Sequence, residues 1–509
     1  MTETLEAPTQ QKLKQINHWI GGRAVAGASG RKGAVYNPAT GRQAAEVDFA
    51  TTEEVDAAVQ AAKAASAEWR HVSIAKRAEL FFRIRELVHE RKEQVAKILV
   101  SEHGKVLSDA LGEVTRGLEV IEYCCGIPTL LKSEYSEQAS TGIDVYSIRQ
   151  PLGVVAGITP FNFPAMVPMW MWAPALACGN TFVLKPSEKD PSASVWTAEL
   201  LKEAGVPDGV FNVVHGDKVA VDGLLEHPDV SAISFVGSTP VARYVYERGT
   251  AAGKRVQAFG SAKNHMVALP DCNLDFAADA AVSAAYGASG QRCMAVAALV
   301  AVGEVADPLV AAIAERARAL RIGGFQDEGS ELGPLVSRAA CERVVGHIAG
   351  AEAAGAELVL DGRAYEHPQH RDGFYVGPTL VDRVTPQMDV YTQEVFGPLL
   401  PVLRVETLDA AIELLNASPY GNGAAIFTAS GGAARRFERE AQAGMIGVNV
   451  PIPIPVAQYS FGGWKASRFG DVHMSGPEGY RFYTKGKIVT TRWPETSSGV
   501  NLAFGGAGR

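Results

Sequence analysis

The stretch that decides the fold covers residues 153–164 and reads GVVAGITPFNFP. Its first half is a short apolar run typical of a buried strand, and its second half holds two prolines and an asparagine, which favour a turn. Similar apolar runs lie at 181–184, 210–214 and 230–236, each followed by turn residues and a segment of helical character. This alternation predicts a doubly wound parallel sheet, which would bind ligands beyond the carboxyl ends of its strands.

A second alternating block, at about 297–450, predicts a second α/β domain. Its expected strands lie near 297–302, 399–405, 424–427 and 446–450, and its expected helices near 307–320, 337–354 and 407–417. Before residue 142 the periodicity predicts helices at about 52–69, 74–103 and 107–131. The alternating segment 142–149 predicts a projecting ribbon, which the β-rich segment 481–491 could pair with, unless that segment pairs with another subunit.

Composition narrows the class of protein. A chain of 509 residues, 47% hydrophobic and 20% charged, is expected to form two or three soluble globular domains. Its net charge of −8 gives no electrostatic reason to expect nucleic acid or an anionic membrane as a partner. The apolar stretch 165–177 is interrupted by two prolines and is too short to cross a bilayer. We therefore expect no membrane association.

The cysteines and the N-terminus bear on metal binding and location. Six cysteines are scattered without a C-x-x-C pair or the histidine spacing of a zinc site, so no metal is expected. The N-terminus is acidic and lacks the apolar core of a signal peptide. Both features favour the cytoplasm, where thiols stay reduced.

The first candidate for chemistry is Cys293, at the end of a run of small residues. The stretch 286–295 reads YGASGQRCMA, and its glycines and alanines let a ligand or another backbone approach closely. The positive charge of Arg292 would lower the pKa of the neighbouring thiol from its free value of about 8.5. A nucleophile is one interpretation, and a buried structural cysteine is the other.

Asn162 follows the first strand of the block, between two prolines and two aromatic residues. Its amide can donate two hydrogen bonds from a rigid mount, which suits an oxyanion hole. In isolation, an asparagine that merely forms a turn is the commoner case.

The next strand ends are candidates for binding a nucleotide. Lys185 and Glu188 follow one strand and could bind ribose hydroxyls, although a solvated loop explains them equally well. Gly237 and Ser238 follow another strand and open a helix, whose free N–H groups could bind a pyrophosphate. A merely well-capped helix is the alternative, since the sequence contains no G-x-G-x-x-G fingerprint.

Taken together, these motifs resemble the aldehyde dehydrogenase superfamily over nearly the whole chain. In chain order they are PFNFP at 160–164, KPSE at 185–188, FVGST at 235–239, GQRC at 290–293 and EVFGP at 394–398. The resemblance implies an α/β fold with a Rossmann-like NAD-binding domain at 18–131 and 152–263 and a catalytic domain at 264–479. It also implies an oligomerisation ribbon and tail at 132–151 and 480–509. Members of the family are usually dimers or tetramers, and a homotetramer built as a dimer of dimers is the expected state here.

The resemblance also implies a role for each motif residue. Cys293 is the nucleophile, and Asn162 is an oxyanion donor together with the backbone N–H of Cys293. The implied cofactor-binding residues are Phe161, Lys185, Glu188, Ser238, Glu394 and Phe396. Among them, Lys185 and Glu188 face the adenosine ribose, Ser238 the pyrophosphate, and Glu394 with Phe396 the nicotinamide riboside.

One departure from the family pattern changes the expected reaction. Hydrolytic members carry a glutamate that activates water, whereas the matching stretch here, residues 259–263, reads FGSAK and has no carboxylate. A thiol is a far better nucleophile than unassisted water, so coenzyme A is the expected acyl acceptor. The surrounding sequence resembles the CoA-acylating methylmalonate-semialdehyde dehydrogenase branch of the family, which implies a part in valine catabolism.

The branch implies that Arg116 and Arg292 bind the carboxylate of the semialdehyde, and a guanidinium suits this task because it binds carboxylates bidentately. Loss of CO2 from the thioacyl enzyme and transfer to CoA would then give propionyl-CoA or acetyl-CoA. By itself, Arg116 is more often a surface charge on a helix. A hydrolytic NAD-dependent aldehyde dehydrogenase for another small semialdehyde and a non-catalytic protein on the same fold are the alternatives.

Overall fold

The first of two large sheets carries the segment that decides the fold. The structure, a computed structural model, describes residues 13–493. This sheet has eight strands in the order β22-β12-β11-β8-β9-β10-β2-β3. They are β2 (His18–Ile20), β3 (Arg23–Val25), β8 (Val154–Ile158), β9 (Thr181–Lys185), β10 (Phe211–Val213), β11 (Val230–Val236), β12 (Arg255–Phe259) and β22 (Arg468–Phe469). Strands β8 to β11 run parallel, as predicted, and β12, which was not predicted, extends the parallel set.

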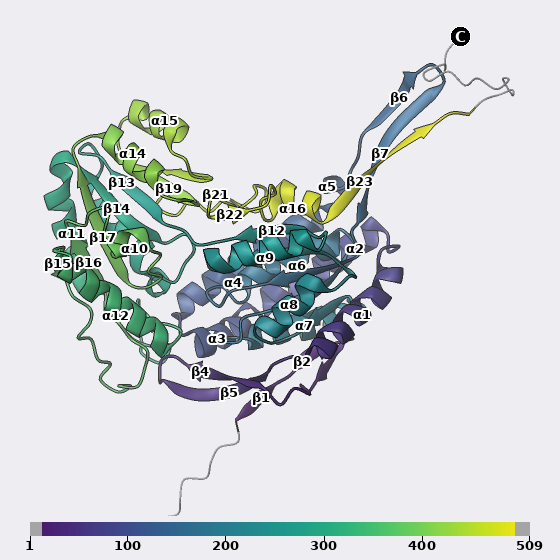
Figure 1. The fold of residues 1–509 in the computed structure, drawn as a ribbon, viewed down its shortest axis with the longest axis horizontal. Coiled ribbons are helices and arrows are strands. Elements are labelled where there is room, and N and C mark those ends of the chain that lie inside the picture. Colours follow the sequence, from purple (N-terminus) through teal and green to yellow (C-terminus); the bar gives the residue numbers. More distant parts are fainter. Residues whose placement is uncertain (1–12, 494–509) are drawn as a thin grey trace, which may run out of the picture.

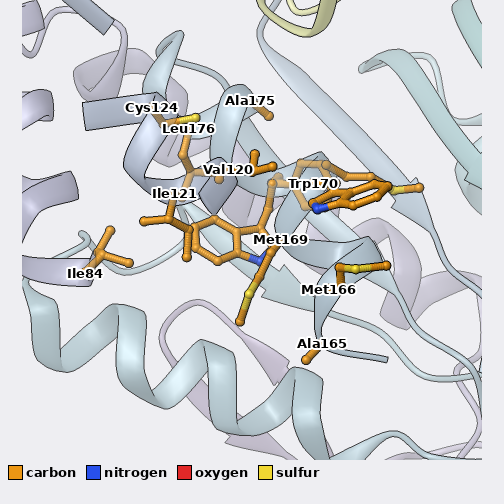
Figure 2. Close-up of a cluster of buried hydrophobic side chains, with 14 of the residues drawn as sticks. Ile84, Val120, Ile121, Cys124, Ala165, Met166, Met169, Trp170, Ala175 and Leu176 are labelled. Carbon is orange, nitrogen blue, oxygen red and sulfur yellow. The ribbon is translucent and has the colours of Figure 1, made fainter. Parts of the chain in front are cut away.

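Helices cover both faces of this sheet (Figure 1). They are α1 (Thr52–Trp69), α2 (Ile74–Glu90), α3 (Lys92–His103), α4 (Leu107–Cys125), α5 (Ile127–Leu130), α6 (Met166–Ala177), α7 (Ser192–Ala204), α8 (Lys218–Glu226) and α9 (Thr239–Ala251). Side chains alternate along β8, so Val154 and Ala156 pack with α1, α8 and α9, whereas Val155 belongs to the cluster with α2, α4 and α6. Figure 2 shows this second cluster, whose labelled members include Met169 and Trp170 of α6 and Ile121 of α4.

The second large sheet has seven strands in the order β15-β16-β17-β14-β13-β19-β20. They are β13 (Asn264–Ala268), β14 (Val296–Val302), β15 (Glu357–Leu360), β16 (Thr379–Asp382), β17 (Leu399–Val405), β19 (Gly423–Phe427) and β20 (Met445–Val448). Its helices are α10 (Leu274–Tyr286), α11 (Ala306–Arg318), α12 (Arg338–Ala353), α13 (Asp389–Thr392), α14 (Leu408–Ala417) and α15 (Gly431–Glu440), with short 3-10 turns η1 (Gly287–Gly290) and η2 (Gly303–Val305). The chain passes from the first sheet to the second over residues 260–263.

A three-stranded ribbon projects from the body of the molecule (Figure 1). It is formed by β6 (Tyr135–Ser140), β7 (Ile143–Pro151) and β23 (Thr484–Thr491), with β7 in the centre. The predicted pairing of the tail with the ribbon is therefore confirmed, but the strand starts at Thr484 because α16 (Gly476–Phe482) precedes it. The smaller sheets are β1 (Lys14–Ile16) with β5 (Arg42–Asp48) and β4 (Lys32–Asn37), and β18 (Tyr420–Gly421) with β21 (Trp464–Lys465). Residues 1–12 and 494–509 of the expected lead-in and tail lie outside the described residues.

Two expected helices are each divided in the structure. Arg91 leaves the helical conformation (φ −108°, ψ 15°) between α2 and α3, and its guanidinium pairs with Glu203 of α7. Gly126 separates α4 from α5. Hydrophobic periodicity continues across both breaks, which is why the sequence predicts longer helices. Within residues 13–493, no helix combines the length and apolar character needed to span a membrane.

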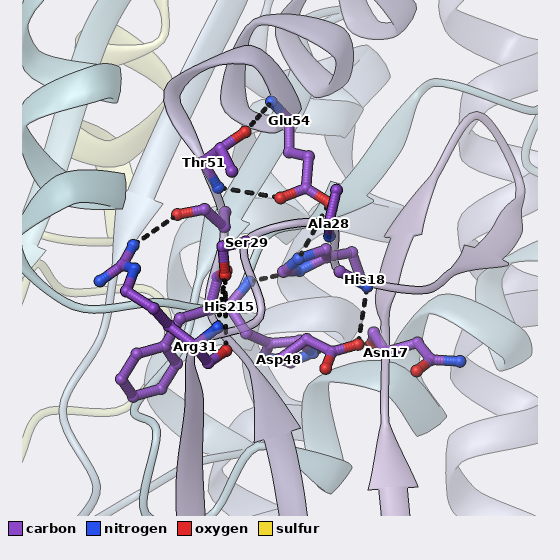
Figure 3. Close-up of polar contacts among 12 residues, drawn as sticks. Asn17, His18, Ala28, Ser29, Arg31, Asp48, Thr51, Glu54 and His215 are labelled. Atoms are coloured by element: carbon purple, nitrogen blue, oxygen red, sulfur yellow. Dashed lines mark hydrogen bonds and ion pairs between the residues drawn. The ribbon is translucent and has the colours of Figure 1, made fainter.

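Two buried histidines lie side by side in the first sheet, His18 at the start of β2 and His215 just after β10, the strand paired with β2 (Figure 3). The rings of His18 and His215 stack with their centroids 5.8 Å apart, and Nδ1 of His18 accepts a hydrogen bond from the His215 backbone N–H at 3.1 Å. Nε2 of His215 lies 3.1 Å from the Asn17 carbonyl oxygen, which only a protonated Nε2 can donate to. Burial lowers the pKa of both rings, that of His215 to about 3, so both are neutral near pH 7.

We predict that acidification destabilises the protein through these histidines. The unfolded chain protonates histidine below about pH 6.5 while His215 in the folded chain stays neutral, so His215 removes about 1.4 kcal/mol of unfolding free energy per pH unit below that point, and His18 acts in the same direction. The thermal midpoint should fall between about pH 7.5 and 5.0, and it should fall less in His215→Asn. Buried carboxylates with a raised pKa act in the opposite direction, but equally in both proteins. An identical pH dependence in the two would show that His215 takes no part.

Candidate active site

Six of the ten predicted site residues meet in a cavity of about 460 Å³ between the two large sheets. Of the residues predicted from sequence, it is lined by Phe161, Asn162, Ser238, Cys293, Glu394 and Phe396. The first three follow β8 and β11, adjacent parallel strands from which the chain continues to opposite sides of the sheet. Such a switch point is where open α/β sheets bind ligands. The prediction of a ligand site beyond the carboxyl ends of the strands therefore located this cavity correctly.

The backbone before Cys293 adopts an unusual conformation. Ala288, Ser289 and Gly290 all have positive φ, at 49°, 55° and 70°. A Cβ on Gly290 would lie 2.1 Å from the carbonyl oxygen of Gly397, so only glycine fits at that position. After this turn, the carbonyl of Cys293 accepts hydrogen bonds from the side-chain amides of Asn264 at 2.9 Å and Asn422 at 3.2 Å. The main chain of Cys293 is therefore held by the close packing before it and by the two hydrogen bonds to its carbonyl.

Asn162 is only 3% exposed, yet its side-chain amide makes none of the hydrogen bonds found among the described residues. Its main chain is held instead, because its carbonyl accepts a hydrogen bond from Nζ of Lys105 at 2.7 Å. Since the amide lines the same cavity as Cys293, its two N–H groups are available to an oxygen that develops charge there.

The electrostatic environment of Cys293 differs from the expectation. Burial, followed by the neighbouring Glu394 carboxylate, raises the pKa of the thiol to about 12, and the lowering effect of Arg292 is smaller. Arg292 also forms an ion pair with Asp109 of α4. Arg292 thus lowers the thiol pKa, as predicted, but burial and the Glu394 carboxylate outweigh this effect and keep the pKa above its free value.

Asp109 links Arg292 to the strained turn. One carboxylate oxygen pairs with the guanidinium and the other accepts the backbone N–H of Ala288 at 2.9 Å. A Cβ on Gly287 would lie within 2.7 Å of three guanidinium atoms, so the guanidinium packs directly on this glycine. Arg292 therefore lies beside the nucleophile with a carboxylate partner already in place.

Arg116 is located differently. Its guanidinium pairs with Glu119 on the next turn of α4 at 2.8 Å, and 41% of its side chain is exposed. Its carbonyl accepts a hydrogen bond from Nε1 of Trp170 at 3.3 Å, which ties this turn of α4 to α6. Binding of a substrate carboxylate by Arg116 and Arg292 stays a prediction.

The candidate nucleotide-binding residues lie at strand ends. Nζ of Lys185, at the buried end of β9, is 3.5 Å from a carboxylate oxygen of Glu188. Ser238 is the N-cap of α9, but no hydrogen bond from its side chain caps that helix. The hydroxyl of Thr239, by contrast, already accepts a hydrogen bond from the backbone N–H of Ser261 at 2.9 Å. The Ser238 hydroxyl is thus available to an anion, whereas the backbone N–H of Thr239 already donates to the Ser261 hydroxyl at 3.3 Å and Pro240 has no N–H.

Glu394 and Phe396 approach from the second sheet. Glu394 accepts the backbone N–H of Ala262 at 2.9 Å, and burial raises the pKa of its carboxyl group. Phe396 has a positive φ of 55°, and its ring meets that of Phe161 edge to face with centroids 5.8 Å apart. The two predicted groups of cofactor-binding residues are therefore in direct contact across the cavity.

The segment 259–263, where a catalytic glutamate would stand, offers no carboxylate. Ser261 lines the cavity, and Nζ of Lys263 donates to the carbonyl oxygens of Val390 and Gln393, both at 2.8 Å. Burial lowers the pKa of Lys263 to about 7. Sequence reasoning missed the supporting roles of Lys263, Asn264, Asn422, Asp109 and Lys105, because none of them follows a strand whose end it had singled out.

Comparison with known proteins agrees with this geometry. Residues 25–489 match the model of the aldehyde dehydrogenase family. The chain therefore belongs to the aldehyde dehydrogenase family, and both the recognition from motifs and the predicted α/β fold are confirmed.

Particular relatives cover nearly the whole chain. A malonate-semialdehyde dehydrogenase of Pseudomonas aeruginosa is 53% identical over 484 residues, which cover 95% of this chain and 97% of that protein. A crystal structure of a methylmalonate-semialdehyde dehydrogenase from Oceanimonas doudoroffii matches with a TM-score of 0.94 and 50% identity, covering 95% of this chain and 99% of that one. A structure from Sinorhizobium meliloti 1021, complexed with NAD and assigned as methylmalonate-semialdehyde dehydrogenase, has a TM-score of 0.95 and 49% identity over 96% of this chain and 99% of its own.

The raised pKa of Cys293 gives a direct prediction for the ligand-free protein. Alkylation of Cys293 by iodoacetamide, followed by mass spectrometry of its peptide, should be slow at pH 8 and should rise without a plateau to pH 10, because only the thiolate reacts. Glu394→Gln removes the nearby negative charge and should speed alkylation several-fold at a given pH. Glu203→Gln, a charge loss on α7 remote from the cavity, is the control. A plateau near pH 8 would contradict the high pKa.

Proposed function

We propose that this protein oxidises malonate or methylmalonate semialdehyde with NAD, loses CO2 from the acyl group, and transfers the resulting acetyl or propionyl group to coenzyme A. The observation that carries the proposal is the single cavity that holds a cysteine nucleophile, an uncommitted asparagine amide and a nucleotide-type switch point, with no carboxylate in the segment that would activate water. The names of the relatives support the substrate and the cofactor.

The residues present fit NAD. The buried Lys185 with Glu188 suits ribose hydroxyls, the Ser238 hydroxyl at the start of α9 suits a pyrophosphate, and Glu394 with Phe396 suits the nicotinamide riboside. Bound there, the nicotinamide supplies the hydride acceptor that converts the adduct of thiol and aldehyde into a thioester.

The chain's own residues then perform the acyl chemistry. The Cys293 thiol gives its proton to solvent, and the thiolate attacks the aldehyde carbon. The oxygen that becomes an alkoxide accepts hydrogen bonds from Asn162 and from the Cys293 backbone N–H. In the thioester, the carbonyl accepts the electron pair of the carbon–carbon bond as CO2 leaves, and the α-carbon then takes a proton. Arg116 and Arg292 hold the carboxylate before it leaves, and the CoA thiolate displaces Cys293.

A homotetramer in the cytoplasm is part of the proposal. Strand β23 pairs with β7 on one side, and Ile488 near its middle is 67% exposed. An exposed apolar residue on the outer strand of a ribbon favours pairing with another subunit. The six cysteines are all free, which fits a reducing compartment.

Product analysis with and without CoA tests the function. With malonate or methylmalonate semialdehyde and NAD, we expect sustained NADH formation and an acyl-CoA product only when CoA is present, and about one equivalent of NADH per site without it, because the thioester cannot be hydrolysed quickly. Cys293→Ala should form no NADH and still bind NAD. Sustained turnover to a free acid without CoA would instead identify a hydrolytic enzyme.

A second prediction concerns the substrate carboxylate. Replacing Arg116 or Arg292 with leucine removes a charge-assisted contact worth about 1.5–3 kcal/mol, so kcat/KM with the semialdehyde acids should fall by about tenfold to more than a hundredfold. The value for the neutral substrate propanal should change much less.

Asp109→Asn is the matched control for Arg292, because it breaks the ion pair but leaves the guanidinium and an oxygen that can still accept the Ala288 N–H. In Asp109→Asn, kcat/KM for the semialdehyde acids should stay high relative to kcat/KM for propanal. If Arg292→Leu lowers kcat/KM equally for the semialdehyde acids and for propanal, Arg292 supports the nucleophile segment and does not bind the carboxylate.

A further inference from the structure

A buried ion pair lies directly behind the cavity. Lys105, between α3 and α4, and Glu113 of α4 have side chains that are 0% exposed, and Nζ lies 2.5 Å from one carboxylate oxygen of Glu113. Removing two charges from water is expensive, and a buried pair of apolar residues often stabilises a fold as well or better. The pair therefore calls for an explanation beyond the packing of α4.

Both members of the pair bond to the segment that follows β8. Nζ of Lys105 donates to the carbonyl oxygen of Asn162 at 2.7 Å and lies 4.5 Å from the centre of the Phe163 ring. The second carboxylate oxygen of Glu113 accepts the backbone N–H groups of Ala165 at 2.8 Å and Met166 at 3.1 Å. The pair thus forms hydrogen bonds to the main chain at both ends of the segment 162–166.

The local sequence explains why outside support is needed. Helix α6 begins after Ala165, an N-cap residue without a side chain that can cap it. The Glu113 carboxylate takes that place from another helix and also meets the positive end of the α6 dipole. At the other end of the segment, Lys105 is the donor for the Asn162 carbonyl.

We propose that Lys105 and Glu113 are positioning residues for Asn162: together they fix the main chain of residues 162–166 so that the Asn162 amide faces the oxygen formed at Cys293. This inference rests on the proposed function, in which Asn162 stabilises that oxygen. Neither lysine nor glutamate touches the substrate, and each acts through the carbonyl of Asn162 or the start of α6.

Lys105→Met should shift the Asn162 amide away from its position facing Cys293. It removes the donor to the Asn162 carbonyl, and a displacement of about 1 Å can lower a rate by about a hundredfold. We expect the pre-steady-state NADH burst with propanal to slow by about tenfold to a hundredfold. Lys254→Met is the matched control, because Lys254 is also buried and donates to two carbonyls, those of His227 and Val230. It should lower thermal stability without changing the burst.

The double variant Lys105→Met/Glu113→Gln separates positioning from stability. It replaces the ion pair with neutral side chains, and the glutamine oxygen can still accept the N–H groups of Ala165 and Met166. We expect its thermal midpoint to recover towards that of the wild type while its burst stays slow, because the Asn162 carbonyl still lacks its donor. If Lys105→Met alone does not fold, this variant gives the same information.

Combination with Asn162→Ala provides the decisive comparison. Asn162→Ala should itself slow the burst by about 10²–10³. Adding Lys105→Met and Glu113→Gln to it should change the burst by no more than about twofold, because the group that they position is gone. The inference would be overturned if the reductions in burst rate multiplied in the combined variant. A normal burst in the folded double variant would also overturn it. A normal burst in Asn162→Ala would instead remove Asn162 from the proposed reaction, which is a different failure.

Discussion

The chain continues from β8 and from β11 to opposite sides of the first sheet, and the function of the molecule depends on this divergence. It opens a space beyond two adjacent strands, each of which is paired with a neighbouring strand on both sides. The second sheet closes that space by supplying Cys293, Glu394 and Phe396. One sheet therefore contributes the positions typical of nucleotide binding, and the other contributes the sulfur.

The ends of strands made part of this site predictable. Asn162 and Ser238 each follow an apolar run, and the geometry of parallel sheets brings such positions to one edge. Lys105 and Asp109 reach the site from the region around α3 and α4, where the sequence shows only amphipathic periodicity. Their importance arises from contacts between residues far apart in sequence, which periodicity and local motifs do not encode.

The fold shows the same division. Runs of valine and isoleucine predicted β8 and β11, but β12 (Arg255–Phe259) was not predicted, because Arg255 and Gln257 interrupt its apolar character. In the structure Gln257 is buried and donates to the Ser234 hydroxyl at 2.9 Å on the adjacent strand. A polar residue can lie in a buried strand when a neighbour accepts a hydrogen bond from it, and that neighbour is known only once the strands are paired. The thiol of Cys293 gives a similar lesson, since Arg292 is next to it in sequence while the pKa is decided by burial and Glu394.

The root of the ribbon is tied to the same strand that leads to Asn162. Strand β7 continues into β8 through Leu152 and Gly153, whose backbone N–H groups both donate to the side-chain oxygen of Asn180, at 2.7 and 3.1 Å. The amide nitrogen of Asn180 donates to the carbonyl oxygen of Tyr483, just before β23. One buried side chain is therefore hydrogen-bonded to the bases of both strands. A force applied to the tip of the ribbon would be transmitted through Asn180 to β8 and to the segment that holds Asn162.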